Sequence, residues 1–288
     1  MNIFGTGLSG LVGSRIVELL TPSFQFENAS LDTGVDITDR SAISRAIKGT
    51  SASWVFHFAA YTNVQKSEEF RDAGERGLPW QVNVSATETI AALCRETKKH
   101  LLYLSTDYVF DGKKHSYSEE DRPHPLGWYA VTKYEGEKRV AALGPLGLVV
   151  RIANPYRANP VGKTDFVHKI KDLLGSGKPV PAPTDQLFMP TFIDDIAVAL
   201  KHLILAEATG IYHVTGEDAL SPYEGAWEIA RTWGLSTDNI QKTTFVEFMK
   251  GRAPAPAHAV LLHDKIKKLG VSMRTFREGL REVKRQES

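Results

Sequence analysis

Short apolar runs alternate with amphipathic segments along the first half of the chain. The segment 53–58, Ser-Trp-Val-Phe-His-Phe, is almost continuously apolar, which is typical of a parallel strand covered on both faces. Runs of this kind predict strands at residues 1–4, 24–27, 53–58, 101–104 and 146–152. Segments with helical spacing predict helices at 11–20, 40–48, 80–98 and 129–142. This alternation indicates an α/β fold with a doubly wound parallel sheet and right-handed crossovers.

The pattern changes after Arg151, where Pro and Gly become frequent. Four prolines between positions 179 and 190 and a Gly-Ser-Gly at 175–177 are typical of loops. The remaining patterns predict helices at 165–174, 193–206, 223–232 and 275–283, and a short strand at 211–214. We therefore expect a nucleotide-binding domain over 1–153 and a smaller, loop-rich, mainly substrate-binding part over 154–288. Within that part, residues from about 192 to 214 are expected to pack back on the first domain.

Composition narrows the class of protein. The chain has 288 residues, a net charge of +1 and one cysteine, Cys94. The charge gives no argument for nucleic acid or an anionic membrane, and no apolar run approaches the roughly 18 residues of a membrane span. A single cysteine excludes an internal disulfide and suits a reducing compartment. These features favour a cytoplasmic protein with no nucleic-acid, membrane or metal partner, and a homodimer is one candidate assembly.

A glycine-rich loop follows the first predicted strand. Gly7, Gly10 and Gly13 lie between that strand and the helix 11–20, which begins at Leu11 and Val12. Glycines at this spacing let the backbone turn tightly and approach a pyrophosphate, and the helix aims its first amides at that anion. Glycines also serve ordinary turns, but a preceding strand and a following helix are the context that the motif requires. We therefore predict a Rossmann-type site for NAD(H) or NADP(H).

An acidic residue lies where the cofactor's adenosine ribose is expected. Glu27 follows Gly7 by 20 residues, at the end of the second predicted strand. No Lys or Arg occurs between 27 and 36 to hold a 2′-phosphate, which slightly favours NAD(H). Glu27 is equally compatible with a solvated acid, and Arg15 remains a candidate for reaching a phosphate. Further cofactor-binding candidates come from two later loops: Asp36, Ile37, Ala59, Ala60 and Tyr61.

Tyr129 and Lys133 form the main candidate for chemistry. They are four residues apart on a predicted helix, so they share one face. A neighbouring ammonium favours the tyrosinate and is expected to lower the Tyr129 pKa toward working pH. Such a phenol can transfer a proton to an oxygen while a hydride moves at the adjoining carbon. The alternative is a chance pair on a solvated helix face.

Thr106 is the candidate partner of that pair. It follows the strand 101–104, and ligands of open α/β sheets bind outside the carboxyl ends of the strands. A hydroxyl there can donate a hydrogen bond to a carbonyl oxygen near Tyr129. The alternative is that Thr106 only caps the following loop.

Taken together, these motifs resemble one enzyme family. The glycine loop, Ala-Ala-Tyr-Thr-Asn-Val at 59–64, Ser-Thr-Asp-Tyr-Val-Phe-Asp-Gly at 105–112 and the Tyr129/Lys133 pair are similar to the extended short-chain dehydrogenase/reductases. Within them the chain resembles the dTDP-4-dehydrorhamnose reductase branch, and the likeness spans nearly the whole sequence. It implies a catalytic triad of Thr106, Tyr129 and Lys133, in which Lys133 also bonds the nicotinamide ribose.

The resemblance also implies the substrate, a nucleotide sugar with a 4-keto-6-deoxy group. One position departs from the branch, because Asn154 stands where a Trp usually packs on the sugar. This departure leaves the identity of the sugar open. Arg252 is a candidate for pairing with a diphosphate, although a solvated loop arginine fits its position equally well. The substrate-binding candidates are Thr62, Asp107, Tyr108, Asn154 and Arg252.

Two other readings stay open. The beta subunit of methionine adenosyltransferase resembles the same branch, so a non-catalytic, NAD(P)-binding regulatory subunit is one alternative. An epimerase or 4,6-dehydratase of the superfamily is the other. The dehydratases place Asp-Glu directly after the catalytic Thr, whereas this chain has Asp107-Tyr108, which favours plain hydride transfer.

Overall fold

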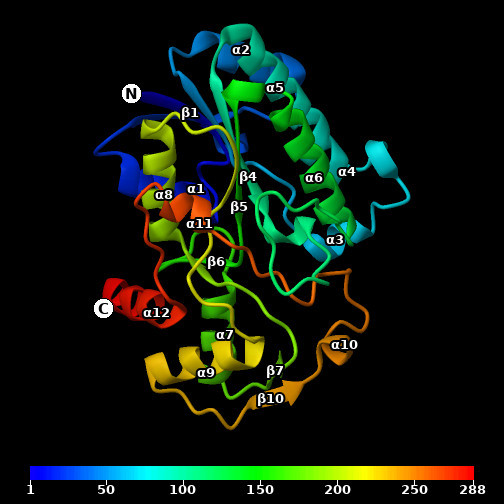
Figure 1. Cartoon of the computed structure of the whole chain (residues 1–288), viewed down its shortest axis with the longest axis vertical. Coiled ribbons are helices and arrows are strands. Elements are labelled where there is room, and N and C mark those ends of the chain that lie inside the picture. Colours follow the sequence, from blue (N-terminus) through cyan, green and yellow to red (C-terminus); the bar gives the residue numbers. More distant parts are fainter.

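A six-stranded parallel sheet forms the centre of the computed structural model, which describes all residues from 1 to 288 (Figure 1). The strand order is β2-β1-β3-β4-β5-β9, and every neighbouring pair is parallel. The doubly wound α/β fold predicted from the sequence is therefore confirmed. The strands are β1 (Asn2–Thr6), β2 (Gln25–Ala29), β3 (Trp54–His57), β4 (His100–Thr106), β5 (Gly147–Ile152) and β9 (Gly210–His213).

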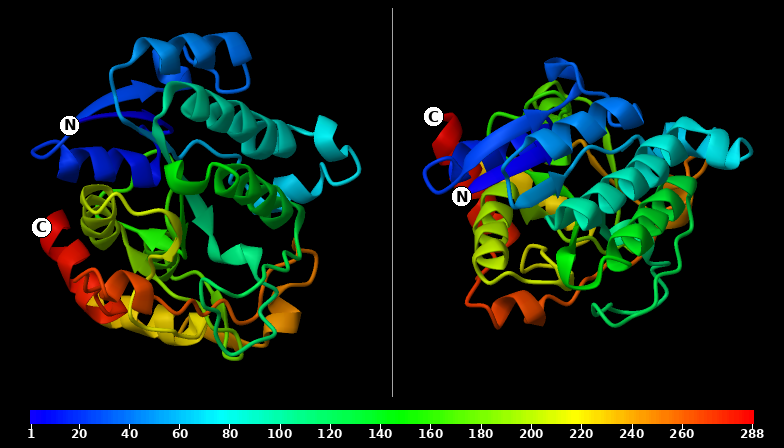
Figure 2. Two further views of the ribbon diagram at one scale, coloured as in Figure 1. Left: turned by 45° about the horizontal axis from the view of Figure 1, so that its top comes forward. Right: turned by 90° about the horizontal axis from the view of Figure 1, so that it is seen from above.

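Helices cover both faces of this sheet (Figure 2). Helices α1 (Leu11–Leu20) and α8 (Ile193–Leu205) pack on one face, and α2 (Arg40–Gly49), α5 (Ala86–Thr97) and α6 (Trp128–Ala141) on the other. Neighbouring strand residues divide between the two cores: Ile3 packs with the α1 side and Phe4 with the α2 side. Burial on both faces explains why the inner strands β1, β3, β4 and β5 read as mostly apolar runs.

The strand order creates a crevice at one edge of the sheet. From β1 the chain crosses to β2 on one side and then returns to β3 on the other side of β1. The loops that leave the carboxyl ends of β1 and β3 therefore diverge, and such a switch point is where open α/β sheets bind ligands.

The rest of the chain forms a smaller, loop-rich part below the sheet in Figure 1. It contains two short sheets, β6 (Pro155–Tyr156) with β8 (Thr191–Phe192) and β7 (Val180–Pro183) with β10 (Ile240–Thr243). An aromatic and aliphatic core that includes Tyr156, Phe192 and Phe276 holds this part together. Its helices are α7 (Phe166–Gly175), α9 (Pro222–Trp233), α10 (Phe245–Phe248) and α12 (Phe276–Glu287), whereas α11 (Asp264–Lys267) packs through Ile266 on the core of the central sheet.

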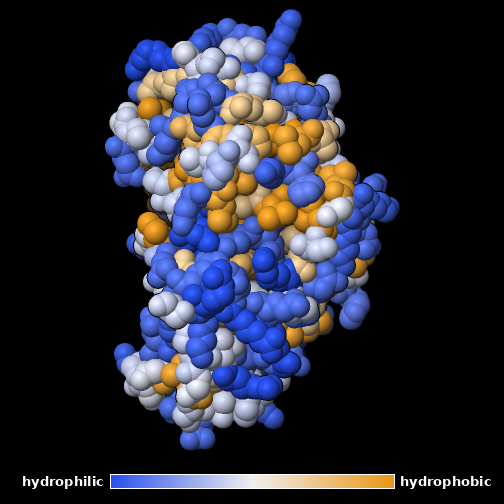
Figure 3. All heavy atoms as spheres, turned by 90° about the vertical axis from the view of Figure 1, so that its left-hand side faces the viewer, coloured by the Kyte–Doolittle hydropathy of each residue, from blue (hydrophilic) through white to orange (hydrophobic).

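Hydrophobic side chains are not evenly spread over the surface. On the face at the left of Figure 1, they gather over the upper half, and the lower half is mostly hydrophilic (Figure 3).

No helix in the structure combines the length and the hydrophobicity that crossing a membrane requires.

One predicted helix differs from the structure. Residues 80–98 were expected to form a single helix, but α4 (Leu78–Trp80) leads into a π-helical turn, η3 (Gln81–Ser85), before α5 begins. Asn83 lies in this turn, 1% exposed. π-turns inside helices often mark functional sites, and this one places Asn83 against the crevice loops. The short helix α3 (Val64–Glu68) precedes it and was not predicted, because five residues are too few to show a period.

Candidate active site

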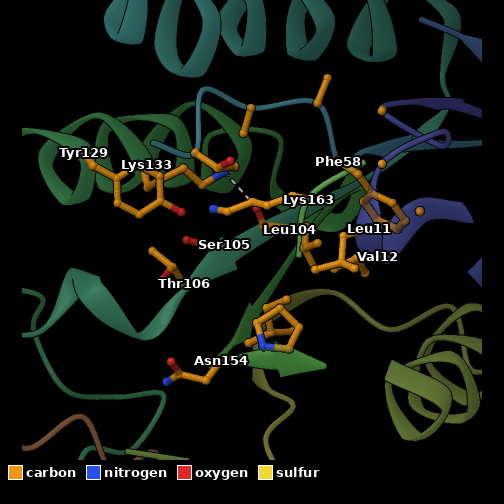
Figure 4. A pocket seen from close by; sticks show the side chains of 18 of the residues that line it. Leu11, Val12, Phe58, Leu104, Ser105, Thr106, Tyr129, Lys133, Asn154 and Lys163 are labelled. Carbon is orange, nitrogen blue, oxygen red and sulfur yellow. Dashed lines mark hydrogen bonds between the residues drawn. The ribbon is translucent and has the colours of Figure 1, made fainter. Parts of the chain in front are cut away.

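A cavity of about 480 Å³ opens at the switch point of the sheet (Figure 4). The loops after β1 and β3, the ends of β4 and β5, helix α6 and a loop over residues 159–164 line it. Most residues singled out from the sequence line this one cavity: Gly7, Gly10, Leu11, Val12, Gly13, Ala59, Ala60, Thr62, Thr106, Asp107, Tyr108, Tyr129, Lys133 and Asn154.

The glycine loop forms a cradle that larger residues would fill. Gly7 has φ +70°, and a Cβ there would lie 2.4 Å from the Ala59 nitrogen. A Cβ on Gly13 would lie 2.4 Å from the Gly7 carbonyl oxygen. Gly10 is the N-cap of α1, and no side chain caps that helix, so its first amides are free for an anion. The cradle therefore fits the pyrophosphate of a dinucleotide.

Several candidates for the adenosine side lie outside the cavity lining. Strand β2 continues to Ala29, so Glu27 sits two residues before its end, exposed and paired in register with Phe4. Asp36 accepts hydrogen bonds from the amide and the hydroxyl of Thr38, and Ile37 is buried in the core. The structure thus gives no support to the slight preference for NAD(H) that rested on Glu27.

Two arginines considered for anion binding are engaged elsewhere. Arg15 binds the Asp194 carboxylate through two nitrogens, each at 2.7 Å, and also contacts Glu18. Arg252 is exposed, and its guanidinium lies 4.1 Å from the centre of the Phe248 ring. Neither side chain lines the cavity.

Thr106 and Asp107 stand at the end of β4. The Thr106 hydroxyl donates to Asp107 Oδ1 at 3.0 Å and accepts the Tyr108 amide hydrogen at 3.3 Å. The second carboxyl oxygen of Asp107 is buried and has no hydrogen-bond partner. Burial raises the pKa of Asp107 to about 7, so this carboxyl changes charge near neutral pH.

The Tyr129 pKa shifts in the direction opposite to the one expected from the sequence. Burial raises the Tyr129 pKa, and the charge of Asp107 raises it further, whereas Lys133 was expected to lower it. Lys133 donates instead to the Leu104 carbonyl oxygen at 2.8 Å and lies 3.9 Å from the centre of the Tyr103 ring. Burial lowers the Lys133 pKa to about 7, opposed by the charge of Glu137. Desolvation therefore outweighs the i,i+4 charge effect in this pocket.

Asn83 holds the two sides of the crevice together. Its Oδ1 accepts the Tyr61 amide hydrogen at 2.8 Å, and its Nδ2 donates to the Thr132 hydroxyl at 2.9 Å and to the Tyr61 carbonyl oxygen at 3.2 Å. Tyr61 itself does not line the cavity, and its ring lies edge-on to Phe70. The amide of Asn83 thus fixes the loop after β3 relative to α6.

Two polar residues of the cavity, Lys163 and Ser105, were not individual candidates from the sequence. Lys163 belongs to an exposed loop, and Figure 4 shows its side chain reaching into the cavity. Ser105 precedes Thr106, and its buried hydroxyl has no partner. Ser105 belongs to the 105–112 motif and Lys163 to the part expected to bind substrate, but no local signal distinguished either residue from its neighbours.

Asn154 explains one departure from the resembled family. Its φ is +41°, in the left-handed region at the turn between β5 and β6. Asn is enriched in this conformation, which bulky residues rarely adopt. The local backbone therefore disfavours a Trp here.

The chain is similar in sequence and in structure to known proteins that include sugar-nucleotide reductases. The family model described as the RmlD substrate binding domain matches residues 1–288. A dTDP-4-dehydrorhamnose reductase from Aggregatibacter actinomycetemcomitans is 32% identical over 77% of this chain and 75% of its own length. Subunit beta of methionine adenosyltransferase 2 from Bos taurus is 30% identical over 86% of this chain and 74% of its own. A dTDP-4-dehydrorhamnose reductase from Bacillus anthracis, solved in complex with NADP, superposes with a TM-score of 0.90 at 27% identity and covers 99% of both chains.

Proposed function

Because this chain belongs to the RmlD substrate binding domain family, we propose that it reduces the 4-keto group of an NDP-4-keto-6-deoxysugar with NAD(P)H. It is an NAD(P)-dependent oxidoreductase related to sugar-nucleotide reductases. One observation carries the proposal: the hydroxyls of Thr106 and Tyr129 and the ammonium of Lys133 line the same cavity as the glycine cradle. A carbonyl carbon bound there lies within reach of both a proton donor and a cofactor.

The glycine cradle would hold the cofactor. Gly7, Gly10 and Gly13 let the backbone approach the pyrophosphate, and the free amides at Leu11 and Val12 face it. Lys133 would bond the nicotinamide ribose. When bound, the nicotinamide supplies the hydride.

Tyr129 would act as the acid that completes the reduction. Its raised pKa keeps the phenol protonated at neutral pH, so a proton is available as negative charge develops on the sugar oxygen. Thr106 would donate a second hydrogen bond to that oxygen and orient it. Thr62, Asp107, Tyr108 and Asn154, which line the same cavity, would surround the sugar.

A regulatory role is the second candidate function, and one observation favours it. The methionine adenosyltransferase subunit from Bos taurus shares 30% identity with this chain. A protein of that kind would bind the cofactor at the glycine cradle without reducing a sugar.

A turnover screen separates the two. Oxidation of NADH and of NADPH is followed with a panel of NDP-4-keto-sugars, and calorimetric titration measures cofactor binding on the same preparation. Turnover of at least one keto sugar is expected. Cofactor binding without turnover of any member of the panel would contradict the reductase and support the regulatory role.

A further inference from the structure

The proton between Thr106 and Asp107 determines what Thr106 can offer a ligand. A hydroxyl carries one proton and two lone pairs, and an ionised carboxylate only accepts. When Asp107 is ionised, the Thr106 proton points at Oδ1, 3.0 Å away, and is withheld from the cavity. When Asp107 is protonated, its O–H can donate to Thr106 Oγ1 instead. The Tyr108 amide occupies the other lone pair, so the Thr106 proton is then free for an oxygen in the cavity.

The surroundings of Asp107 leave its charge without compensation. The ionisable side chains that line the same cavity as Asp107 are Tyr129 and Lys133 from α6, Tyr108 from the same turn and Lys163 from the 159–164 loop. Asp107 forms an ion pair with neither lysine, and Lys133 donates to the Leu104 carbonyl oxygen. Asp107 is 2% exposed, and one of its carboxyl oxygens has no hydrogen-bond partner. A buried carboxylate in this position is costly, which agrees with an Asp107 pKa raised to about 7.

We propose that Asp107 is a positioning residue that acts through Thr106. As a neutral carboxyl it turns the Thr106 hydroxyl toward the sugar carbonyl oxygen, and as a carboxylate it turns that hydroxyl away. The inference rests on the proposed function, because it requires a carbonyl oxygen beside Thr106 and Tyr129. Asp107 transfers no proton to the sugar, since Tyr129 supplies that proton.

The direction of the pH effect follows from the donor geometry. The neutral form of Asp107 dominates below its pKa, so the Thr106 donor is present at low pH and is lost as pH rises through about 7. Loss of one preorganised donor to a developing oxyanion typically lowers kcat by about 10²-fold or more. Lys133 also titrates near pH 7, so the wild-type pH profile alone does not isolate Asp107.

The ratio of the kcat values of Asp107→Asn and the wild type separates the titration of Asp107 from that of Lys133. In Asp107→Asn the side chain stays neutral at every pH and its amide nitrogen can donate to Thr106 as the protonated carboxyl does, while Lys133 titrates as before. We expect the kcat of Asp107→Asn divided by that of the wild type to be near one at low pH. The ratio should then rise about tenfold per pH unit above the midpoint, toward about 10². A ratio that stays constant with pH in the active enzyme would overturn the proposal.

Thr106→Val gives the matched control, because it keeps the shape of the side chain and removes the hydroxyl. The charge of Asp107 also raises the Tyr129 pKa directly, so in the Thr106→Val background only that direct part of the pH-dependent ratio should remain. A pH dependence as large as in the background that keeps Thr106 would overturn the role of Thr106. If Asp107→Asn does not fold, the kcat ratio of wild type to Thr106→Val tests the same point. It should fall from about 10² at low pH toward one at high pH, and a constant ratio would overturn the proposal. A wild type that reduces no keto sugar would refute the proposed function itself, which a flat ratio in an active enzyme would not.

Discussion

The two walls of the cavity are built on different physical principles. The glycine wall, made of Gly7, Gly10 and Gly13 with Leu11 and Val12, presents backbone and leaves no room for a side chain at Gly7 or Gly13. The side-chain wall, made of Thr106, Asp107, Tyr129 and Lys133, presents side chains that titrate or share protons, and all of them except the half-buried Tyr129 are buried. The first wall is set by steric fit and is insensitive to pH. The second is set by desolvation and is expected to respond strongly to pH.

This difference shows which properties each wall can contribute. Backbone amides at a helix N-terminus bind an anion without changing charge, so the glycine wall suits a tightly held cofactor. Burial shifts the pKa values of Asp107 and Lys133 toward 7, so small changes in their surroundings alter their charge. Substitutions on the two walls should therefore separate binding from catalysis.

Tyr129→Phe should give the largest effect. It removes the proton donor and keeps the ring, so kcat should fall by about 10²–10⁴-fold while cofactor affinity stays unchanged. Steady-state kinetics and calorimetric titration measure the two quantities. Tyr134→Phe on the same helix is the matched control, because Tyr134 does not line the cavity. If Tyr129→Phe lost as much cofactor affinity as rate, the claim that one wall serves binding and the other catalysis would be wrong.

Gly13→Ala should act on the other wall. Its Cβ would lie 2.4 Å from the Gly7 carbonyl oxygen and 2.6 Å from the Leu8 Cα, so the cradle must distort. Overpacking of this kind costs about 1–3 kcal/mol. Because the cradle must regain its shape to hold the pyrophosphate, we expect this cost to appear as a loss of cofactor affinity of about 5–150-fold. Gly49→Ala is the control, since a Cβ there meets no atom within 4 Å. Unchanged NADPH affinity in Gly13→Ala would remove the cradle from the cofactor site.

Lys163→Ala should give the smallest effect. The side chain is exposed on its loop yet reaches into the cavity, where it can pair with a diphosphate. Exposed ion pairs contribute up to about 1 kcal/mol, so the affinity for the cofactor or the sugar nucleotide should fall by no more than about fivefold. The loss should shrink as salt is added. Lys169→Ala on α7, outside the cavity lining, should change neither affinity, and equal losses in both variants would exclude a specific contact by Lys163.

The sequence predicted the sheet, most of its helices and most of the cavity residues. Their signals are local: apolar runs for the strands, Gly spacing for the cradle and the i,i+4 spacing of Tyr129 and Lys133. Glu27 lies outside the cavity because β2 extends two residues further than its apolar run. The end of β2 is determined by its pairing with β1, so the residues of β2 alone do not predict where the strand ends.

The electrostatics could not be predicted from spacing alone. The direction of the Tyr129 pKa shift depends on how completely the fold buries the phenol, and the neighbour that dominates, Asp107, comes from another element. Asn83 likewise gains its role only when β3, η3 and α6 meet. Tertiary contacts between distant segments decide these properties.

The fate of the hydride tests the central claim most directly. With NADPH carrying deuterium at the transferred position, the wild type should place one deuterium at C4 of the sugar, observed by mass spectrometry and NMR. Tyr129→Phe should place it at the same carbon about 10²–10⁴-fold more slowly. Oxidation of the cofactor without deuterium at C4, or labelling by Tyr129→Phe at the wild-type rate, would contradict a sugar 4-keto reductase that uses Tyr129 as its acid.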